Sequence, residues 1–283
     1  MISLLNWTGQ HFARHGLDSP RLSAEILLSH CLNCDRLELY TRHDYRPDER
    51  QLDSFRKLVQ RATHNEPIAY LVGHKEFYSL SFTVTPDVLI PRSETEALVD
   101  ESVTHLRGLA RKTWMWDVCT GSGCVAIAAA TQVDHVRVLA TDISAKALDL
   151  AGANARSHGV SDRIIFAKAD LLSLPDDLAY RGPFDVIAAN PPYVAVGDPV
   201  AEQVAYEPEQ ALMAGADGLD FIRPLVASAG DFLAVGGLLA MEFGQGQADQ
   251  VRDIIVSTGR FAEPRILRDH QNIERIALAK IVH

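Results

Sequence analysis

The most informative stretch of the chain is Phe184-Asp-Val-Ile-Ala-Ala-Asn-Pro-Pro-Tyr193, an apolar run followed by two consecutive prolines. The run from Phe184 to Ala189 is β-branched in its middle, which is typical of a buried strand in a parallel sheet. Proline cannot continue such a strand, because it has no N–H to donate to the next strand. The sequence therefore predicts an α/β fold with a rigid loop at the carboxyl end of this strand, where open α/β sheets bind ligands.

The loop holds two hydrogen-bond acceptors in fixed positions. Proline fixes φ at Pro191 and Pro192, and Pro191 keeps Asn190 extended. The Asn190 side-chain oxygen and the Pro191 carbonyl oxygen are then placed to accept both N–H bonds of a planar NH2 group, while the Tyr193 ring lies against its flat face. We expect the loop to bind an amide or an exocyclic base amine. A plain strand-ending turn is the alternative, since Asn-Pro and Pro-Pro are common in turns.

A second motif lies near residue 120, where strand and helix patterns begin to alternate, as in a parallel sheet covered on both faces. An expected strand, 114–119, leads into the glycine turn Thr120-Gly-Ser-Gly123 and then into a helix, 124–130. Asp142 ends the next strand, 21 residues after Gly121. At this spacing an acid meets the ribose hydroxyls of a cofactor whose other end lies over the glycine turn.

Two missing features indicate which cofactor binds. The turn lacks the third glycine of a dinucleotide fingerprint, and no Gly-Lys-Ser/Thr phosphate loop follows it. S-adenosylmethionine, a nucleoside without phosphates, therefore fits better than NAD or ATP. We expect Gly121 and Gly123 to face its methionine part, Asp142 its ribose, and Asp170, at the end of the strand 164–167, its adenine amine. A helix cap is the alternative role for Asp170.

Composition and charge limit the class of protein. The chain has 283 residues, 47% of them hydrophobic, which is enough for one large and one small domain. No apolar run approaches the ~20 residues of a membrane span, and the N-terminus has no signal-peptide pattern, so we expect a cytoplasmic protein. Of the net charge of −10, residues 1–75 contribute +1 and the rest −11, without the basic face that duplex DNA would require.

The cysteines indicate a reducing compartment and no metal. Four cysteines, Cys31, Cys34, Cys119 and Cys124, are too few and too unevenly spaced for a disulfide framework. Cys31 and Cys34 have the spacing of a redox or zinc pair, but no second pair follows them. We interpret them as buried helix residues.

The remaining chain divides into three parts. Residues 1–73 show helical patterns throughout, and we interpret them as a small bundle that recognises a partner, with a stabilising appendage as the alternative. Residues 74–92 contain an alternating stretch that predicts a β-hairpin linker. The catalytic domain then spans 93–283. Ser93 and Glu96 have the spacing of a capping box at the start of its first helix. Arg92 is expected to border the pocket, and the last two strands, 264–267 and 273–279, are expected at a sheet edge.

These motifs together resemble the protein-(glutamine-N5) methyltransferases of peptide chain release factors (the HemK/PrmC family). The resemblance covers nearly the whole length and includes Glu66-Pro-Ile-Ala-Tyr-Leu-Val-Gly73, Val88-Leu-Ile-Pro-Arg92 with Thr95-Glu96, Asp117 to Gly123, Asn190-Pro-Pro-Tyr193, and Tyr206-Glu-Pro208 with Asp217-Gly-Leu-Asp220. It departs from the family pattern at Cys119, where many members have glycine, at Leu171, where some have an aromatic residue, and at Ser93, which replaces a frequent proline.

The resemblance implies a seven-stranded class I methyltransferase (Rossmann-like) sheet, S-adenosylmethionine as donor and S-adenosylhomocysteine as product. It implies as acceptor the glutamine of the Gly-Gly-Gln motif of class 1 release factors, bound by a monomer without direct contact to nucleic acid. The implied catalytic residues are those of the 190–193 loop: Asn190, Pro191, Pro192 and Tyr193. The implied donor-binding residues are Cys119, Thr120, Gly121, Ser122, Gly123, Asp142, Asp170, Leu171 and Asn190.

Three alternatives stay open at this point. The run Cys119-Thr-Gly-Ser-Gly-Cys124 is also similar to the sister enzymes that methylate a glutamine of ribosomal protein L3. The Asn-Pro-Pro-Tyr loop is shared with DNA adenine-N6 methyltransferases, so an exocyclic base amine of nucleic acid is a second acceptor class. A non-catalytic adaptor that keeps the fold and binds the translation machinery is the third.

Overall fold

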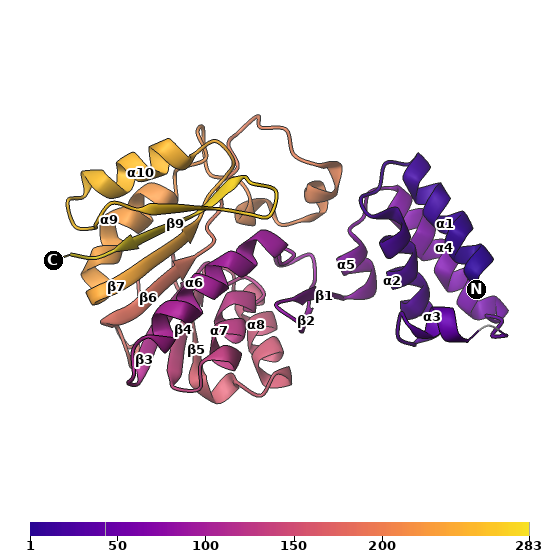
Figure 1. The fold of residues 1–283 in the computed structure, drawn as a ribbon, viewed down its shortest axis with the longest axis horizontal. Helices are drawn as coiled ribbons and strands as arrows, with labels where there is room; N and C mark the ends of the chain where they lie inside the picture. Colours follow the sequence, from indigo (N-terminus) through magenta and orange to yellow (C-terminus); the bar gives the residue numbers. More distant parts are fainter. Residues whose placement is uncertain (43, 283) are drawn as a thin grey trace. The chain divides into compact units, whose positions relative to one another are not determined.

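The computed structural model describes residues 1–42 and 44–282, and the chain forms two compact units within them. The first contains Met1–His74 together with Val200–Tyr206, and the second contains Lys75–Pro199 and Glu207–His283. Figure 1 follows the chain through both. No helix of the described ranges is both long and apolar enough to cross a membrane.

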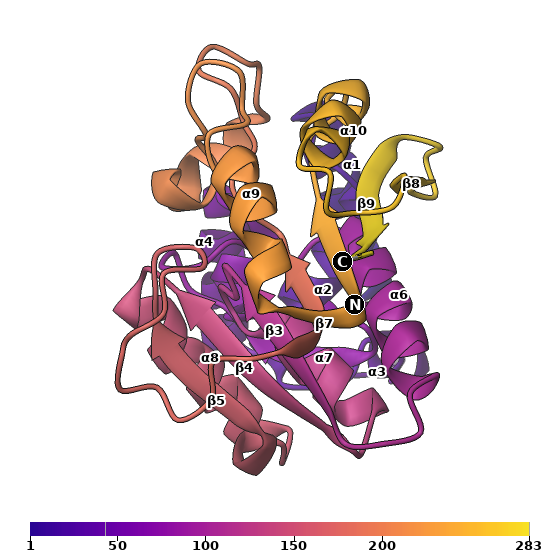
Figure 2. The same ribbon diagram turned by 90° about the vertical axis from the view of Figure 1, so that its left-hand side faces the viewer.

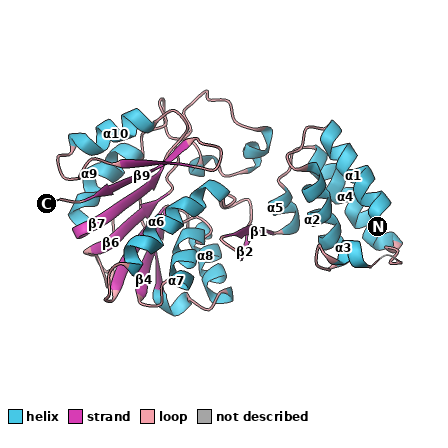
Figure 3. Cartoon of the chain, viewed as in Figure 1, coloured by secondary structure: helices cyan, strands magenta, loops and turns pink. Residues whose placement is uncertain are grey.

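The first unit is helical, as its sequence predicts (Figure 3). Its helices are α1 (Ile2–Arg14), α2 (Pro20–Leu32), α3 (Glu38–Thr41), α4 (Glu49–Thr63) and α5 (Ile68–Val72). Pro20 stands at the first position of α2, where its missing N–H costs nothing, and Asp48 closes a capping box with Gln51 at the start of α4. The apolar faces meet around Leu27, Leu28 and Phe55, all nearly inaccessible to solvent.

The second unit is built on a seven-stranded sheet whose strand order is β5-β4-β3-β6-β7-β9-β8 (Figure 2). Strands β3 to β7 pair in parallel, whereas β9 runs antiparallel to both β7 and β8. The bounds are β3 (Thr113–Val118), β4 (Val136–Asp142), β5 (Ile164–Lys168), β6 (Phe184–Ala189), β7 (Leu233–Glu242), β8 (Arg265–Arg268) and β9 (Glu274–Lys280). A separate pair of strands, β1 (His74–Phe77) and β2 (Leu80–Thr83), confirms the predicted hairpin.

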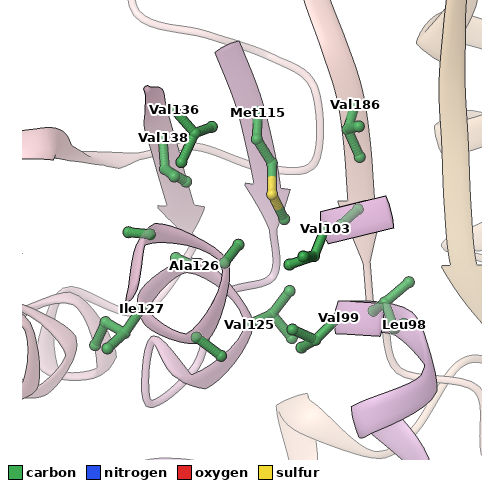
Figure 4. Close-up of a cluster of buried hydrophobic side chains, with 14 of the residues drawn as sticks. Leu98, Val99, Val103, Met115, Val125, Ala126, Ile127, Val136, Val138 and Val186 are labelled. Atoms are coloured by element: carbon green, nitrogen blue, oxygen red, sulfur yellow. The ribbon is translucent and has the colours of Figure 1, made fainter. Parts of the chain in front are cut away.

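Helices cover both faces of the sheet, and alternate residues of each strand supply the two cores. Met115 of β3 and Val186 of β6 lie against α6 (Glu96–Arg107) and α7 (Cys124–Gln132), as Figure 4 shows. The helix α8 (Ala145–Ser157) contributes to the same core. Trp116 faces the opposite core with α9 (Ile222–Phe232) and α10 (Ala248–Ser257). Since both faces of β6 are buried, its residues are mostly apolar, which explains the run that ends at Ala189.

Three expectations from the sequence were wrong. Cys31 and Cys34 are not buried helix residues, because both are only half-buried and Cys34 lies beyond the end of α2 at Leu32. The strand at 274–280 is not at an edge, because β8 pairs with its outer side and β7 with its inner side. Ser93 and Glu96 form no capping box: Ser93–Thr95 is a short 3-10 turn, and the α6 N-cap has no side-chain hydrogen bond. Glu96 instead accepts the Tyr78 N–H of the hairpin turn at 2.8 Å, a long-range partner that the local pattern does not contain.

The register of the parallel strands brings several polar residues to one level. Val118 of β3 pairs with Thr141 of β4 and with Ala189 of β6, and Ala189 pairs with Met241 of β7. One residue farther along each strand are Cys119, Asp142, Asn190 and Glu242. The carboxyl edge of the sheet therefore gathers these four side chains from four neighbouring strands, as expected for an open α/β sheet.

Candidate active site

A cavity of about 480 Å³ lies at this carboxyl edge, within the second unit. Its size is that of a small-molecule site. Of the catalytic and donor-binding residues predicted from the sequence, those that line it are Cys119, Thr120, Gly121, Ser122, Asp142, Asp170, Leu171, Asn190 and Pro192. The sequence motifs thus converge on one cavity, although they are separated by up to 73 residues of chain between 119 and 192.

Asp142 is held in a fixed orientation at the glycine turn. Its carboxylate accepts the Gly121 N–H at 2.9 Å through one oxygen and the Ser144 N–H at 2.9 Å through the other. Gly121 has φ of +53°, and an added Cβ would meet no atom within 4 Å, so the space above it is open to a ligand. Burial raises the pKa of the Asp142 carboxyl, and the backbone donors oppose that shift. An oriented acid beside an open turn fits the ribose end of a nucleoside.

Asp117 adds a second acid to the cavity wall. It accepts the Thr120 hydroxyl at 2.5 Å and the Ala126 N–H at 3.1 Å, which tie β3 to the turn and to α7. Burial raises the pKa of this carboxyl to about 7. Asp170 lines the same cavity. Among the described residues that line the cavity, five carry a carboxyl group and Arg92 alone carries a cation, so a cationic ligand is favoured over an anionic one.

Gly123 has a packing role that sequence reasoning did not foresee. It is the N-cap of α7 with φ of +82°, and an added Cβ would lie 3.0 Å from Ala151 and from Ile127. Gly123 is not among the described residues that line the cavity. Its contact with a donor stays a prediction, while its observed function is to let α7 approach α8.

Asn190 presents an unpaired acceptor. Its side-chain NH2 donates to Thr95 Oγ1 at 3.2 Å. Its Oδ1 is buried and has no hydrogen-bond partner among residues 1–42 and 44–282. Since Asn190 lines the cavity, a buried carbonyl oxygen without a partner is a place where a ligand N–H is expected.

Tyr193 and Pro191 of the same loop are not among the described residues that line the cavity. The Tyr193 hydroxyl donates to Glu242 Oε1 at 3.1 Å, and burial raises the Tyr193 pKa. The structure therefore places Asn190 and Pro192 at the cavity and Tyr193 one layer behind it, and contact of the Tyr193 ring with an acceptor stays a prediction.

Arg92 lines the cavity, as expected, and is paired with a buried acid. The Glu207 side chain, 2% exposed, accepts from Arg92 Nη2 with one oxygen and from the Ile90 N–H at 3.2 Å with the other. This links the segment before α6 to the Tyr206-Glu-Pro208 motif. Both motifs consequently border the site as one connected wall.

The sheet order, the oriented acid at the glycine turn and the acid-lined cavity define an S-adenosylmethionine-dependent methyltransferase of class I. A methyltransferase-domain family model matches residues 116–215. The solved hMettl16 catalytic domain, in complex with the MAT2A 3′UTR hairpin 1, has a similar fold: TM-score 0.59 at 19% identity, covering 82% of this chain and 81% of that one.

Sequence comparison narrows the class. A family model described as the PrmC N-terminal domain matches residues 3–73. The release factor glutamine methyltransferase of Rhodopirellula baltica is 39% identical over 98% of this chain and 94% of its own. That of Chlorobaculum tepidum is 38% identical, covering 97% of this chain and 95% of its own. The chain belongs to the release factor glutamine methyltransferase family, and S-adenosylmethionine is its methyl donor.

Two residues of the site were missed in the sequence. Thr95 lines the cavity and bonds Asn190, and Glu242 lies behind it with a buried carboxylate. Thr95 stands in a motif shared with the family, and Glu242 is an acid at the end of an otherwise apolar strand. An acid in such a strand is a usable signal, because charged residues are rarely buried without a partner.

Proposed function

We propose that this chain transfers the methyl group of S-adenosylmethionine to the side-chain amide nitrogen (N5) of the glutamine in the Gly-Gly-Gln motif of class 1 release factors. The observation that carries the proposal is the buried, unpartnered Oδ1 of Asn190 at the cavity wall of the described chain. The names of the curated relatives support the release factor rather than ribosomal protein L3 as the protein substrate. An amide NH2 is the group that this acceptor fits.

At the donor end, Asp142 would hold the ribose hydroxyls and Asp170 the adenine amine, with Leu171 beside the ring. Cys119, Thr120 and Ser122 would line the methionine part above Gly121. The cofactor supplies a sulfonium methyl group that is already activated for transfer. The acid-lined cavity attracts its positive charge, and Asp117 contributes to that field without a direct bond to the donor.

At the acceptor end, the chain's task is to orient a poor nucleophile, because the lone pair of an amide nitrogen is delocalised into its carbonyl group. Asn190 Oδ1 and the Pro191 carbonyl oxygen would accept the two N–H bonds of the glutamine. These contacts aim the nitrogen at the methyl group and favour the positive charge that develops on it. The methylated nitrogen is acidic and loses its proton afterwards, so the site needs no strong general base.

The first unit is the proposed recognition module for the release factor. It includes Val200–Tyr206, a segment from the connection that follows the Asn-Pro-Pro-Tyr loop. Within this unit the Tyr206 hydroxyl donates to the His64 carbonyl oxygen at 2.8 Å, and Asn65 donates to Glu202. A chain connection that leaves the acceptor loop and is anchored in the helical unit supports a shared role in holding a protein substrate. We propose action in the cytoplasm as a monomer.

The test is mass spectrometry of a class 1 release factor after incubation with the chain and S-adenosylmethionine. We expect one added methyl group, located on the Gly-Gly-Gln glutamine. A release factor with Gly-Gly-Ala is the control and should remain unmodified. Transfer of radiolabelled methyl to nucleic acid instead of the release factor would refute the proposal in favour of the adenine-amine alternative.

The Asn190→Ala variant tests the role of the acceptor loop. Loss of one preorganised hydrogen-bond acceptor typically lowers the rate by about 10²–10³-fold. We expect a loss of this size in kcat, with binding of S-adenosylmethionine by isothermal titration changed little. A variant that turns over at the native rate would show that Asn190 does not hold the acceptor amide.

A further inference from the structure

Glu242 is a buried acid, and donor binding does not explain why it is there. It ends β7 with 1% of its surface exposed, and it is not among the described residues that line the cavity. A carboxylate at such a position is costly unless each oxygen is bonded. Both oxygens do have partners: Oε2 accepts the Thr95 hydroxyl at 2.6 Å, and Oε1 accepts the Tyr193 hydroxyl at 3.1 Å.

The direction of these bonds is determined by chemistry. Burial raises the pKa of Glu242, and the bonds from the Thr95 and Tyr193 hydroxyls oppose that shift. When Glu242 is ionised it has no proton and only accepts, so the Thr95 hydroxyl gives its single proton to Glu242. The same hydroxyl oxygen is then left with acceptor capacity alone. Of the two ends of the Asn190 carboxamide, only the NH2 group can bond it, as observed at 3.2 Å. The Asn190 oxygen is consequently turned toward the cavity.

The opposite orientation of the carboxamide would be inactive. It would present the Asn190 NH2 group to the acceptor glutamine, whose own NH2 also only donates. The two orientations of a carboxamide have nearly the same shape, so packing alone does not select between them. Selection has to come from a hydrogen-bond partner with a fixed direction.

We propose that Thr95 and Glu242 are positioning residues of the methyl-transfer reaction, which together hold the Asn190 carboxamide with its oxygen toward the acceptor amide. Neither touches donor or acceptor by this assignment; both act through Asn190. The assignment rests on the proposed glutamine methylation, in which Asn190 Oδ1 receives an N–H bond.

The sheet explains how these residues meet. Ala189 of β6 is in register with Met241 of β7, so Asn190 and Glu242 are the next residues on neighbouring parallel strands. Thr95 comes from the turn that begins α6, a helix that packs on β6 and β7. Thr95 is 2% exposed, so water does not compete readily for its hydroxyl.

The Thr95→Val variant removes the hydroxyl while keeping the shape, and Thr95→Ser keeps the hydroxyl. We expect Thr95→Val to lower kcat for release factor methylation by about 10–100-fold, the range seen when a group that orients a metal ligand is removed. The dissociation constant for S-adenosylmethionine should stay within about 2-fold of native by isothermal titration, and Thr95→Ser should restore most of the rate. A native kcat in Thr95→Val would overturn the assignment.

Thr113→Val is the matched control. Thr113 is 1% exposed at the start of β3, and its hydroxyl has no hydrogen-bond partner in the described part of the chain. The same substitution there should leave kcat unchanged. If Thr95→Val and Thr113→Val lowered kcat equally, the effect would be one of general packing, and the assignment would fail.

A double-mutant cycle separates positioning from mere stability. If Thr95 acts through Asn190, then Thr95→Val should cause no further loss of kcat in an Asn190→Ala background, because nothing remains to be oriented. Additive losses would overturn the assignment. Native enzyme that fails to methylate release factor would instead refute the proposed function, so the two failures are distinguishable.

Discussion

Replacing Asn190 with aspartate tests whether Glu242 is charged. The two residues are joined by hydrogen bonds through the Thr95 hydroxyl. The Asn190 amide donates to Thr95 Oγ1 over 3.2 Å, and Thr95 Oγ1 donates to Glu242 Oε2 over 2.6 Å. Aspartate would place a second carboxylate across Thr95 from Glu242. Laid end to end the two bonds span 5.8 Å, so the facing oxygens of the two carboxylates can be no farther apart than this.

Two unit charges at that separation repel by about 3 kcal/mol at an effective dielectric constant of about 20. This repulsion corresponds to a combined rise of about two units in the pKa values of the two coupled acids, Glu242 and the aspartate introduced at position 190. Such acids have folded-state pKa values above their unfolded ones, so stability is greatest at low pH and is lost as the pH rises through the folded-state values. We expect Asn190→Asp to be about 3 kcal/mol less stable than Asn190→Ala at pH 8, with most of the difference gone at pH 4.

The assay is urea-induced unfolding of the two variants at both pH values. Asn190→Ala adds no charge and serves as the control for the lost amide. Adding Glu242→Gln to Asn190→Asp removes one of the facing charges, and the pH dependence of the difference should then become smaller, leaving only the part due to burial of Asp at position 190. If Asn190→Asp and Asn190→Ala differ by the same amount at pH 4 and pH 8, Glu242 does not carry a charge opposite position 190.

Three further outcomes are expected. Asp142→Ala should weaken S-adenosylmethionine binding by about 10–100-fold in isothermal titration, since bonds to a charged group contribute about 1.5–3 kcal/mol, and kcat at saturating donor should change less. Burial raises the pKa of Asp117 to about 7, so the stability of the native protein relative to Asp117→Asn should fall by up to about 4 kcal/mol between pH 4 and pH 8. If urea unfolding gives the same stability difference between the two proteins at both pH values, this prediction is wrong. Gly218→Ala would put a Cβ 2.4 Å from the Tyr193 carbonyl oxygen, and we expect it to lower the free energy of unfolding by at least about 2 kcal/mol. Gly246→Ala is the control, because an added Cβ there meets nothing within 4 Å. We expect it to lower the free energy of unfolding by about 1 kcal/mol.

The features that could be predicted are those that local sequence patterns determine. The proline-bounded loop at 190–193, the glycine turn at 120–123 and the acid at Asp142 each follow a strand pattern directly, and the structure brings them to one cavity. Parallel-strand register explains this success, because the residues after neighbouring strands share one edge whatever the sequence between them.

The features that could not be predicted depend on partners far along the chain. Thr95 bonds residues 95 and 147 positions away, so no local pattern around it indicates the network. Glu96 was misread as part of a capping box because its actual partner, the Tyr78 N–H, lies 18 residues earlier in the hairpin. The antiparallel insertion of β9 between β7 and β8 has the same cause, since strand order is set by pairing and not by the composition of either strand.

The same geometry gives a reason for asparagine, and not aspartate, at the head of the loop. Aspartate would be the stronger acceptor for an amide NH2 and would need no orientation, because both of its oxygens accept. It would, however, face the buried Glu242 across Thr95 within 5.8 Å, where the carboxylate of Glu242 is poorly solvated. In the proposed reaction asparagine supplies a neutral acceptor, and of the two ends of its carboxamide only the oxygen can accept the substrate N–H. A buried acid that forces a hydroxyl to accept from the NH2 end resolves this ambiguity, which accounts for keeping Glu242 at the end of an apolar strand.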